Sequence, residues 1–439
     1  MIDAKTEPNR KGLPSLDIRT LSSALAGGLA LAYPAYLVLM FKSHDWIMAA
    51  HGRPAVTDFL VFWLAGKAAL HGAAAAAYDP AVHHAMEVAA AGREFTGQLP
   101  WRYSPLFLVA VAPLALASYL PAFLIWVGAT LSAFALALSR IARSPVGVLL
   151  ACATPAVFIN AICGQNGPLT AALIAAALVC LEEQPIWSGA FIAFLTYKPQ
   201  FGILFPIVLM AGGHWRALIA ATVACAVATL ASCLLFGFDS LRAFLHFLPI
   251  TSNSLLVHGE NGFNKIQTVY GLMRWLGFGN DVGWIAQGAV SASVAGALLG
   301  LWKRDVPYAL KAAGLASAVL LATPHLYAYD FAILMVSFAF LYRERAFDSL
   351  EILGITVANF CIGAFLFVPT PIGLVAILIT VGLIARRVLQ LSAQNRRFSG
   401  RLHRLSFLPP SSGPLTSDSD FRGLPRLRVN ETKVEVESC

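Results

Sequence analysis

Residues 21–41 read LSSALAGGLALAYPAYLVLMF and contain no charged side chain. A helix that crosses the hydrocarbon core of a bilayer needs about 20 mostly apolar residues. Similar apolar runs follow at 121–138, 216–236, 282–302 and 371–384. Across the chain 58% of the residues are hydrophobic and 12% are charged, whereas roughly 25% of the residues of an average soluble domain are charged. The sequence therefore predicts an all-α polytopic membrane protein with about twelve transmembrane helices.

The placement of the basic residues predicts how the chain is oriented. The net charge is +8, and Lys and Arg gather before the first apolar run and after the last. Cytoplasmic segments carry the excess of Lys and Arg in membrane proteins, so both termini are expected in the cytoplasm and no nucleic-acid partner is needed to explain the charge. We expect a cytoplasmic segment at 1–20, a transmembrane domain at 21–389, and a basic, disordered cytoplasmic tail at 390–439.

Two polar stretches interrupt the apolar runs, and both are expected outside the cytoplasm. The first outer loop, 42–102, contains two segments that should form short helices, at 58–70 and at 80–93. The second outer loop, 237–281, mixes Gly and Trp with polar side chains. The sequence therefore places most of its non-membrane structure on one side of the bilayer.

Asp58 stands at the start of the first short helix, and two roles fit it. Its carboxylate could cap the first free backbone N–H groups of the helix. In an apolar setting that raises its pKa, it could instead accept a proton from a sugar or lipid hydroxyl. Phe59, Phe62 and Trp63 follow it and give the helix an apolar face suited to the membrane interface.

The segment 103–118 decides the topology of the middle of the chain. If it crosses the membrane fully, the arginines that follow it at 140 and 143 lie outside. If it only dips into the membrane and returns, those arginines lie inside, and the polar turns further along the chain gather on the outer face. We favour the second arrangement because it obeys the charge rule and gives an even number of spans, as two cytoplasmic termini require.

Several polar residues lie in turns between apolar runs. Arg102 and Tyr103 could anchor the chain at the headgroup level, or Arg102 could hold a lipid phosphate. Gln165 and Asn166 stand in a Gly-Gln-Asn-Gly-Pro turn, where an amide can both donate and accept hydrogen bonds with a sugar hydroxyl. Lys198 could reach the membrane surface by snorkelling or could pair with a phosphate.

The stretch 324–330, PHLYAYD, is the least compatible with mere membrane anchoring. It places His325, Tyr329 and Asp330 at the start of an apolar run. Ionisable groups at such a position need a partner or a ligand. We therefore expect this turn to belong to a functional site.

The sequence contains no phosphate-binding loop, dinucleotide fingerprint, zinc-ligand spacing or nucleophile elbow. The loops are also too short for a soluble domain that would bind a nucleotide sugar. If the protein transfers a sugar, the donor should therefore be a lipid phosphate sugar within the membrane.

Taken together, these motifs resemble glycosyltransferase family 87, which has the GT-C architecture and includes polyprenyl-phosphate-mannose-dependent α-mannosyltransferases. The resemblance covers roughly 21–384 and rests on the Asp58-Phe59 start of the first outer loop, Tyr103-Ser104-Pro105, Gly164-Gln165-Asn166, Lys198-Pro199 and the 324–330 motif. It implies a GT-C-type helical bundle in the inner (plasma) membrane whose active site faces the periplasm or outside.

The resemblance also implies a mechanism. Asp58 matches the general base of an inverting, single-displacement transfer of a hexose, most often mannose, from a polyprenyl phosphate to a glycolipid or glycan acceptor. The departing phosphate would be stabilised by Lys198, His325 and Arg102 through electrostatics. No metal and no cofactor are required. The residues that the sequence and the resemblance assign to substrate binding are Arg102, Tyr103, Gln165, Asn166, Lys198, Lys265, His325, Tyr329 and Asp330.

Two other classes of protein fit the apolar pattern. A transporter or flippase for lipid-linked sugars would show internal repeats and helices broken at the midplane. The sequence shows no clear repeat, and its polar residues lie in turns, which favours an enzyme. A non-catalytic membrane subunit would keep the spans while making Asp58 dispensable.

Overall fold

A computed structural model describes residues 18–49, 52–97 and 99–405, and every regular element in these ranges is a helix. The first part forms α1 (Ile18–Lys42), α2 (Asp58–Leu70), η2 (Ala74–Tyr78), α3 (Pro80–Ala91), η3 (Pro105–Phe107), α4 (Leu108–Val111), η4 (Pro113–Leu116), α5 (Tyr119–Ala142), α6 (Val146–Ala153), α7 (Pro155–Cys163) and α8 (Gly167–Cys180). The second part forms α9 (Pro185–Phe194), η5 (Leu195–Tyr197), η6 (Pro199–Phe201), α10 (Phe205–Ala211), α11 (Trp215–Phe236), α12 (Phe238–Ser252), η7 (Asn253–Val257), η8 (Phe263–Lys265), α13 (Val269–Trp275), α14 (Asn280–Lys303), α15 (Tyr308–Ala322), η9 (Ala328–Phe331), α16 (Ala332–Glu344), α17 (Ser349–Ala364) and α18 (Gly373–Leu405). The predicted all-α class is confirmed.

Five helices of the described chain are long and apolar enough to cross a membrane. They are Thr20–Lys42, Tyr119–Ala142, Trp215–Phe236, Asn280–Lys303 and Gly373–Gln394. The pair α6 and α7 adds a sixth candidate, bent by 53°. Shorter apolar helices, such as α8 and α15, lie between them. The chain is thus a membrane protein, whereas the expected count of twelve spans remains a prediction.

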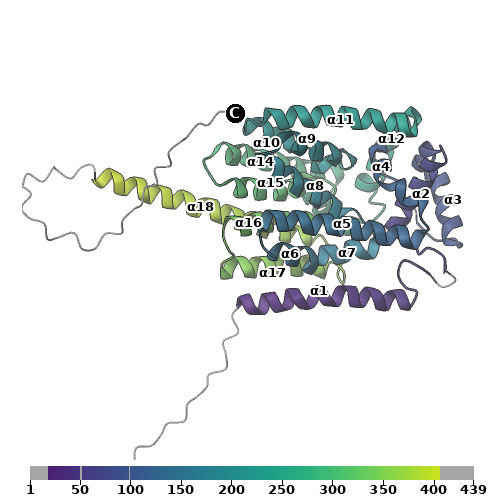
Figure 1. Cartoon of the computed structure of the whole chain (residues 1–439), viewed down its shortest axis with the longest axis horizontal. Coiled ribbons are helices and arrows are strands. Elements are labelled where there is room, and N and C mark those ends of the chain that lie inside the picture. The colour runs from purple at the N-terminus through teal and green to yellow at the C-terminus, as the bar shows by residue number, and fades with distance from the viewer. Residues whose placement is uncertain (1–17, 50–51, 98, 406–439) are drawn as a thin grey trace, which may run out of the picture. The chain divides into compact units, whose positions relative to one another are not determined.

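The surface of α11 shows why this helix belongs in lipid. Its large aliphatic side chains recur at helical spacing and are exposed, among them Ile219, Val223, Val227 and Leu234. A soluble protein rarely exposes so continuous an apolar stripe. The opposite side of α11 packs on α9, and the two lie next to each other in Figure 1.

The centre of the bundle is formed by α15 and α16. Nearly every residue of both helices is buried, and α16 contacts α5, α6 and α8. Because α15 and α16 are joined through η9, the 324–330 motif is held between two fully enclosed helices. The core of the protein therefore fixes the position of this motif.

The first outer loop differs from the expected interfacial arrangement. Phe59 and Phe62 of α2 are 0% and 1% exposed, and the Phe62 ring contacts Trp101, Phe107 and Trp126 at centroid distances of 5.4 to 6.2 Å. The aromatic face of α2 therefore packs within the protein, and the expectation that it faces the membrane surface is wrong. Aromatic side chains favour such edge-to-face clusters.

The segment 103–118 forms only the short pieces η3, α4 and η4. At 1.5 Å of rise per residue, a helix as short as α4 covers about 6 Å, far less than a bilayer core. The segment is therefore not a spanning helix, in agreement with the favoured topology.

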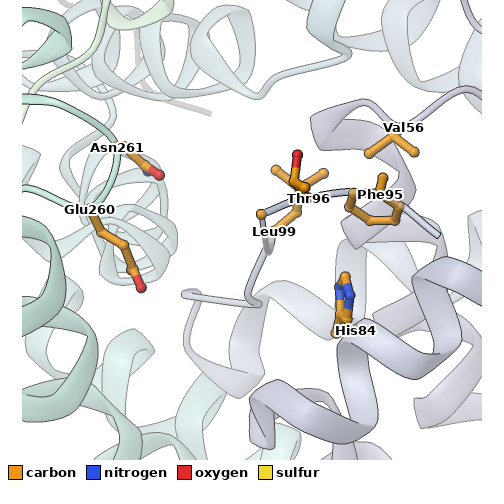
Figure 2. A pocket seen from close by; sticks show the side chains of 8 residues that line it. Val56, His84, Phe95, Thr96, Leu99, Glu260 and Asn261 are labelled. Carbon is orange, nitrogen blue, oxygen red and sulfur yellow. The ribbon is translucent and has the colours of Figure 1, made fainter.

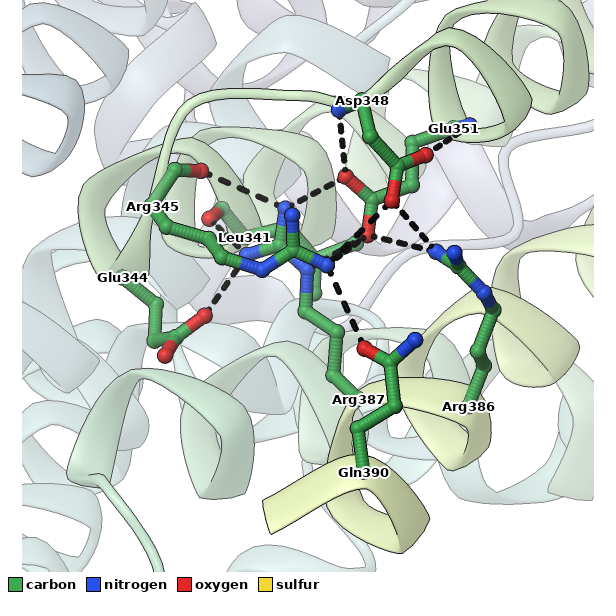
Figure 3. A network of polar contacts seen from close by, with 8 residues as sticks. All are labelled: Leu341, Glu344, Arg345, Asp348, Glu351, Arg386, Arg387 and Gln390. Atoms are coloured by element: carbon green, nitrogen blue, oxygen red, sulfur yellow. Dashed lines mark hydrogen bonds and ion pairs between the residues drawn. The ribbon is translucent and has the colours of Figure 1, made fainter. Parts of the chain in front are cut away.

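The last three helices are joined by a buried ionic network, shown in Figure 3. Arg387 of α18 is 1% exposed and donates from Nε to Glu351 Oε1 at 2.7 Å and from Nη2 to Glu351 Oε2 at 2.8 Å. Arg345 and Arg386 bind the same carboxylate and Asp348. These arginines therefore lie together on one side of the bundle.

The chain divides into two compact units, of which the first ends at Gln390 and the second begins at Leu391. Residues 390–405 continue α18, so the expectation that they are disordered is wrong. The remainder of the expected tail, 406–439, and most of the expected N-terminal segment, 1–17, lie outside the described residues.

Candidate active site

The site is built around the carboxylate of Asp58. Thr57 is the N-cap residue of α2, and Asp58 makes no side-chain hydrogen bond to the helix backbone. Instead Gln165 donates from Nε2 to Asp58 Oδ2 at 2.9 Å. The capping role considered for Asp58 is therefore wrong, and its carboxylate is aimed at another part of the chain.

The turn between α7 and α8 positions Gln165. Gly164 ends α7 in the left-handed conformation with φ of 69°, which favours glycine. The Cβ of any larger residue at Gly167 would collide with the Tyr329 carbonyl oxygen. Asn160 closes the turn, because its Oδ1 accepts from Gly167 N and its Nδ2 donates to Tyr329 O. The two glycines of the Gly-Gln-Asn-Gly sequence therefore allow the turn to pack closely against the 324–330 motif.

Lys198 and Asp330 form a second polar pair. Lys198 Nζ lies 2.7 Å from Asp330 Oδ1, and the two residues are 6% and 3% exposed. Asp330 Oδ2 also accepts from the backbone N–H of Tyr327. The Lys198 ammonium lies 5.0 Å from the centre of the Tyr329 ring. A buried pair of this kind is stable only when both charges keep their partners.

Three cations act on Asp58. Burial raises the pKa of its carboxyl, whereas the Gln165 hydrogen bond and the charges of Arg102, Lys198 and Lys265 lower it. The net direction is upward. Asp58 is nevertheless only half-buried. The group is therefore an enclosed carboxylate that solvent or a ligand can still reach, with a pKa closer to neutrality than that of a surface aspartate.

His325 is neutral, which differs from the expectation that it would add positive charge. Burial, together with the nearby Arg102 and Lys198, lowers the pKa of His325 to about 3. Its Nε2 atom is buried and has no hydrogen-bond partner in the described chain. His325 can therefore donate or accept a hydrogen bond at neutral pH, and its surroundings disfavour the cationic form.

Tyr103 and Asn166 complete the polar surface. The Tyr103 hydroxyl donates to Gln165 Oε1 at 3.4 Å, and the Tyr103 carbonyl accepts from Tyr78. Asn166 is 0% exposed, yet neither atom of its amide meets the geometry of a hydrogen bond within the described chain. A buried amide without partners is costly, so a ligand hydroxyl would stabilise it.

The structure brings the residues predicted for the site into one region. Gln165 contacts Asp58 and Tyr103, and Lys198 contacts Asp330 and Tyr329. Arg102 and Lys265 act on Asp58 through their charge. Lys265 is exposed and makes the loosest contribution.

Two residues of this region were missed by sequence reasoning. Asn160 holds the Gln165 turn, and the only signal for it was an amide within an otherwise apolar stretch. Asn261 donates to the Tyr327 hydroxyl at 3.2 Å, and its position in the second outer loop carried no signal. Among the described residues, no three His, Cys, Asp or Glu side chains converge in a way that could hold a metal ion.

The arrangement suits group transfer. A half-buried carboxylate of raised pKa can take a proton, nearby cations can stabilise a developing negative charge, and free amide and imidazole atoms can bind hydroxyl groups. These are the parts that a transfer to an alcohol with an anionic leaving group needs.

Comparison with known families agrees with this chemistry. The family model described as Glycosyltransferase family 87 matches residues 101–324, about half of the 439-residue chain. The match includes Gln165, Lys198 and Lys265, whereas Asp58 and Asp330 lie outside it. No curated protein and no solved structure matches the chain. The family match favours a transferase over a transporter or a non-catalytic subunit, and by its extent the chain belongs to glycosyltransferase family 87.

Proposed function

We propose that the protein transfers a hexose, mannose in the first instance, from a polyprenyl-phosphate sugar to a glycolipid or glycan acceptor. The observation that carries this proposal is the Asp58 carboxylate, which is held by Gln165 and lies within the electrostatic reach of Arg102, Lys198 and Lys265. A base beside a set of cations fits a reaction that removes a proton from an alcohol and releases a phosphate.

In the proposed reaction, Asp58 takes the proton of the acceptor hydroxyl. The acceptor oxygen forms a bond to the anomeric carbon as the bond from that carbon to the phosphate oxygen breaks. The electron pair of the broken bond stays on polyprenyl phosphate, and the proton on Asp58 is later released to water. A single displacement of this kind inverts the configuration at the anomeric carbon.

The leaving phosphate is stabilised by charge. Its pKa is already low, so it needs cations near it more than it needs a general acid. Arg102 and Lys265 are half-buried and exposed, respectively, and can approach a phosphate. Lys198 is committed to Asp330 at 2.7 Å and contributes chiefly by its field and by fixing the 324–330 motif.

The sugar is oriented by neutral groups. Asn166 and His325 offer buried polar atoms whose hydrogen bonds are not satisfied by any described residue, and Tyr329 lies beside Lys198. Hydroxyl groups of a hexose can donate to and accept from such atoms. These groups therefore bind the sugar ring while the charged groups act on the phosphate and on the proton.

The favoured topology places this chemistry on the outer face of the membrane. The turns that carry Gln165, Lys198 and Asp330 meet in the site, and the arginine network lies on the side that the charge rule assigns to the cytoplasm. In a bacterial cell this arrangement corresponds to an inner-membrane enzyme whose site faces the periplasm.

The proposal is tested by the mass profile of lipids and glycans from a deletion strain. Wild type should restore a product that is heavier than its precursor by one hexose, and Asp58→Asn at equal membrane level should not. Asp239→Asn is a matched control, because Asp239 is an exposed carboxylate whose ion-pair partner among the described residues is the exposed Arg242. Full restoration by Asp58→Asn would exclude Asp58 as the base.

A further inference from the structure

A cavity of about 570 Å³ lies between the two outer loops, shown in Figure 2. Val56, His84, Phe95 and Thr96 of the first loop line one side of it, and Glu260 and Asn261 of the second loop line the other. Its volume is within the range of about 300 to 1,000 Å³ that small-molecule sites occupy. The proposed transfer reaction uses none of these six residues.

The cavity borders the Asp58 site at two points. Val56 precedes Asp58 by two residues. On the other side, Asn261 donates to the Tyr327 hydroxyl at 3.2 Å. The backbone N–H of Tyr327 in turn donates to Asp330 Oδ2 at 3.2 Å, so the cavity adjoins the 324–330 motif. A group bound in the cavity would therefore lie beside the turn that carries Asp330, and the Val56 wall is two positions along the chain from Asp58.

The lining differs in charge from the surroundings of Asp58. Neither Lys nor Arg is among the described residues that line the cavity, whereas three cations act on Asp58. The Glu260 carboxylate accepts a hydrogen bond from Ser254 and lies 3.9 Å from Arg102 at the boundary between the two regions. A phosphate would be repelled by Glu260 in the cavity and attracted by the cations beside Asp58.

The remaining lining groups suit an uncharged, hydroxylated ring. Glu260, Asn261 and Thr96 offer acceptors and donors for hydroxyl groups. Phe95, whose ring centre lies 5.0 Å from that of His84, offers an apolar surface to the C–H face of a sugar. The combination of hydrogen-bonding side chains with one aromatic wall is typical of a small-molecule site with a few orienting polar groups.

We propose that this cavity is the acceptor subsite and that it binds an uncharged sugar ring of a saccharide-bearing acceptor. The inference rests on the proposed transfer reaction and adds to it the place where the saccharide of the acceptor binds. The donor phosphate then occupies the cationic side of Asp58, the acceptor sugar occupies the cavity, and the acceptor hydroxyl reaches Asp58 at the border.

The test uses purified full-length protein, a synthetic polyprenyl-phosphate mannose as donor, and the precursor fraction extracted from the deletion strain as acceptor. Thr96→Trp fills the cavity and should raise the KM for the precursor fraction by about tenfold or more, with the donor KM unchanged. Asn261→Ala removes one hydrogen-bonding side chain and should raise the acceptor KM by about threefold to tenfold. Thr222→Trp on the exposed face of α11 is the matched control and should leave both constants unchanged.

The outcomes separate this inference from the reaction on which it rests. If wild type transfers mannose but both cavity variants keep the wild-type acceptor KM, the cavity is not the acceptor subsite. If wild type transfers no mannose from the donor, the proposed function fails, and the inference fails with it.

Discussion

The Gln165 amide donates a hydrogen bond of 2.9 Å to the Asp58 carboxylate and thereby joins the turn after α7 to the first residue of α2. Asp58 is left without a capping role, and its pKa is affected by residues from four other parts of the chain. The same amide accepts from Tyr103, so its orientation is fixed from both ends. Gln165 therefore fixes the direction of the carboxylate and lowers its pKa against the larger effect of burial.

Gln165→Leu should shift the pH dependence of the reaction. Asp58 must be deprotonated to act as a base, so activity is lost as the pH falls through its pKa. The Gln165 hydrogen bond lowers that pKa against the effect of burial. Without it, the acid limb of kcat/KM should move to higher pH, and the rate below neutral pH should fall most. An acid limb that stays at the wild-type position would show that Gln165 does not act on Asp58.

Lys198→Met should destabilise the protein by about 3 to 5 kcal/mol, because it leaves the buried Asp330 carboxylate unpaired. Thermal unfolding in detergent measures the effect. The double variant Lys198→Met, Asp330→Leu removes both charges and should recover most of the stability while transfer remains impaired. A single variant that unfolds at the wild-type temperature would contradict the importance of this pair.

His325→Gln should retain transfer within about tenfold of wild type, because a glutamine can replace a neutral hydrogen-bonding group whose net worth is about 1 kcal/mol. The pKa of about 3 for His325 also means that no limb of the pH profile between about pH 5 and 8, where an ordinary histidine titrates, should belong to His325. The measurement is kcat/KM against pH for both proteins. Loss of a limb in the variant would show that His325 titrates during the reaction.

Arg387→Met should lower stability by at least about 2 kcal/mol, because it removes a buried partner of Glu351. Transfer per folded molecule should remain at the wild-type level, since the arginine network lies at the far end of α16 from Asp330, about 18 Å along a helix of this length. Comparison of folded yield with specific activity distinguishes the two effects. A transfer rate per folded molecule that falls clearly below that of wild type would contradict the separation.

Whether a feature could be predicted from the sequence depends on how far apart along the chain its interacting residues lie. Apolar runs are local, so the helices of the bundle and the short helix at Asp58 could be predicted. Gln165 and Asp58 are 107 positions apart, and Lys198 and Asp330 are 132 apart. No local pattern specifies such pairs, and the resemblance to a family was needed to propose that these motifs meet.

Two expectations were wrong for the same reason, because each depends on residues from distant parts of the chain. The aromatic residues of α2 were expected at the membrane interface because their spacing predicts an apolar face, but spacing does not say what covers that face. In the structure Trp101 and Trp126 cover it. The positive charge expected on His325 was not found either, because burial and the charges of Arg102 and Lys198, which lie in other segments, lower the pKa of His325.

The central claim is that Asp58 removes the proton of the acceptor during transfer, and single-turnover kinetics of Asp58→Asn test it most directly. The protein is loaded with synthetic polyprenyl-phosphate mannose, mixed with the precursor fraction, and followed by mass as product forms. We predict that donor affinity stays close to that of wild type while the rate of the chemical step falls by about 10²- to 10⁴-fold, the contribution typical of a general base. A variant that binds donor and transfers mannose at the wild-type rate would contradict the claim.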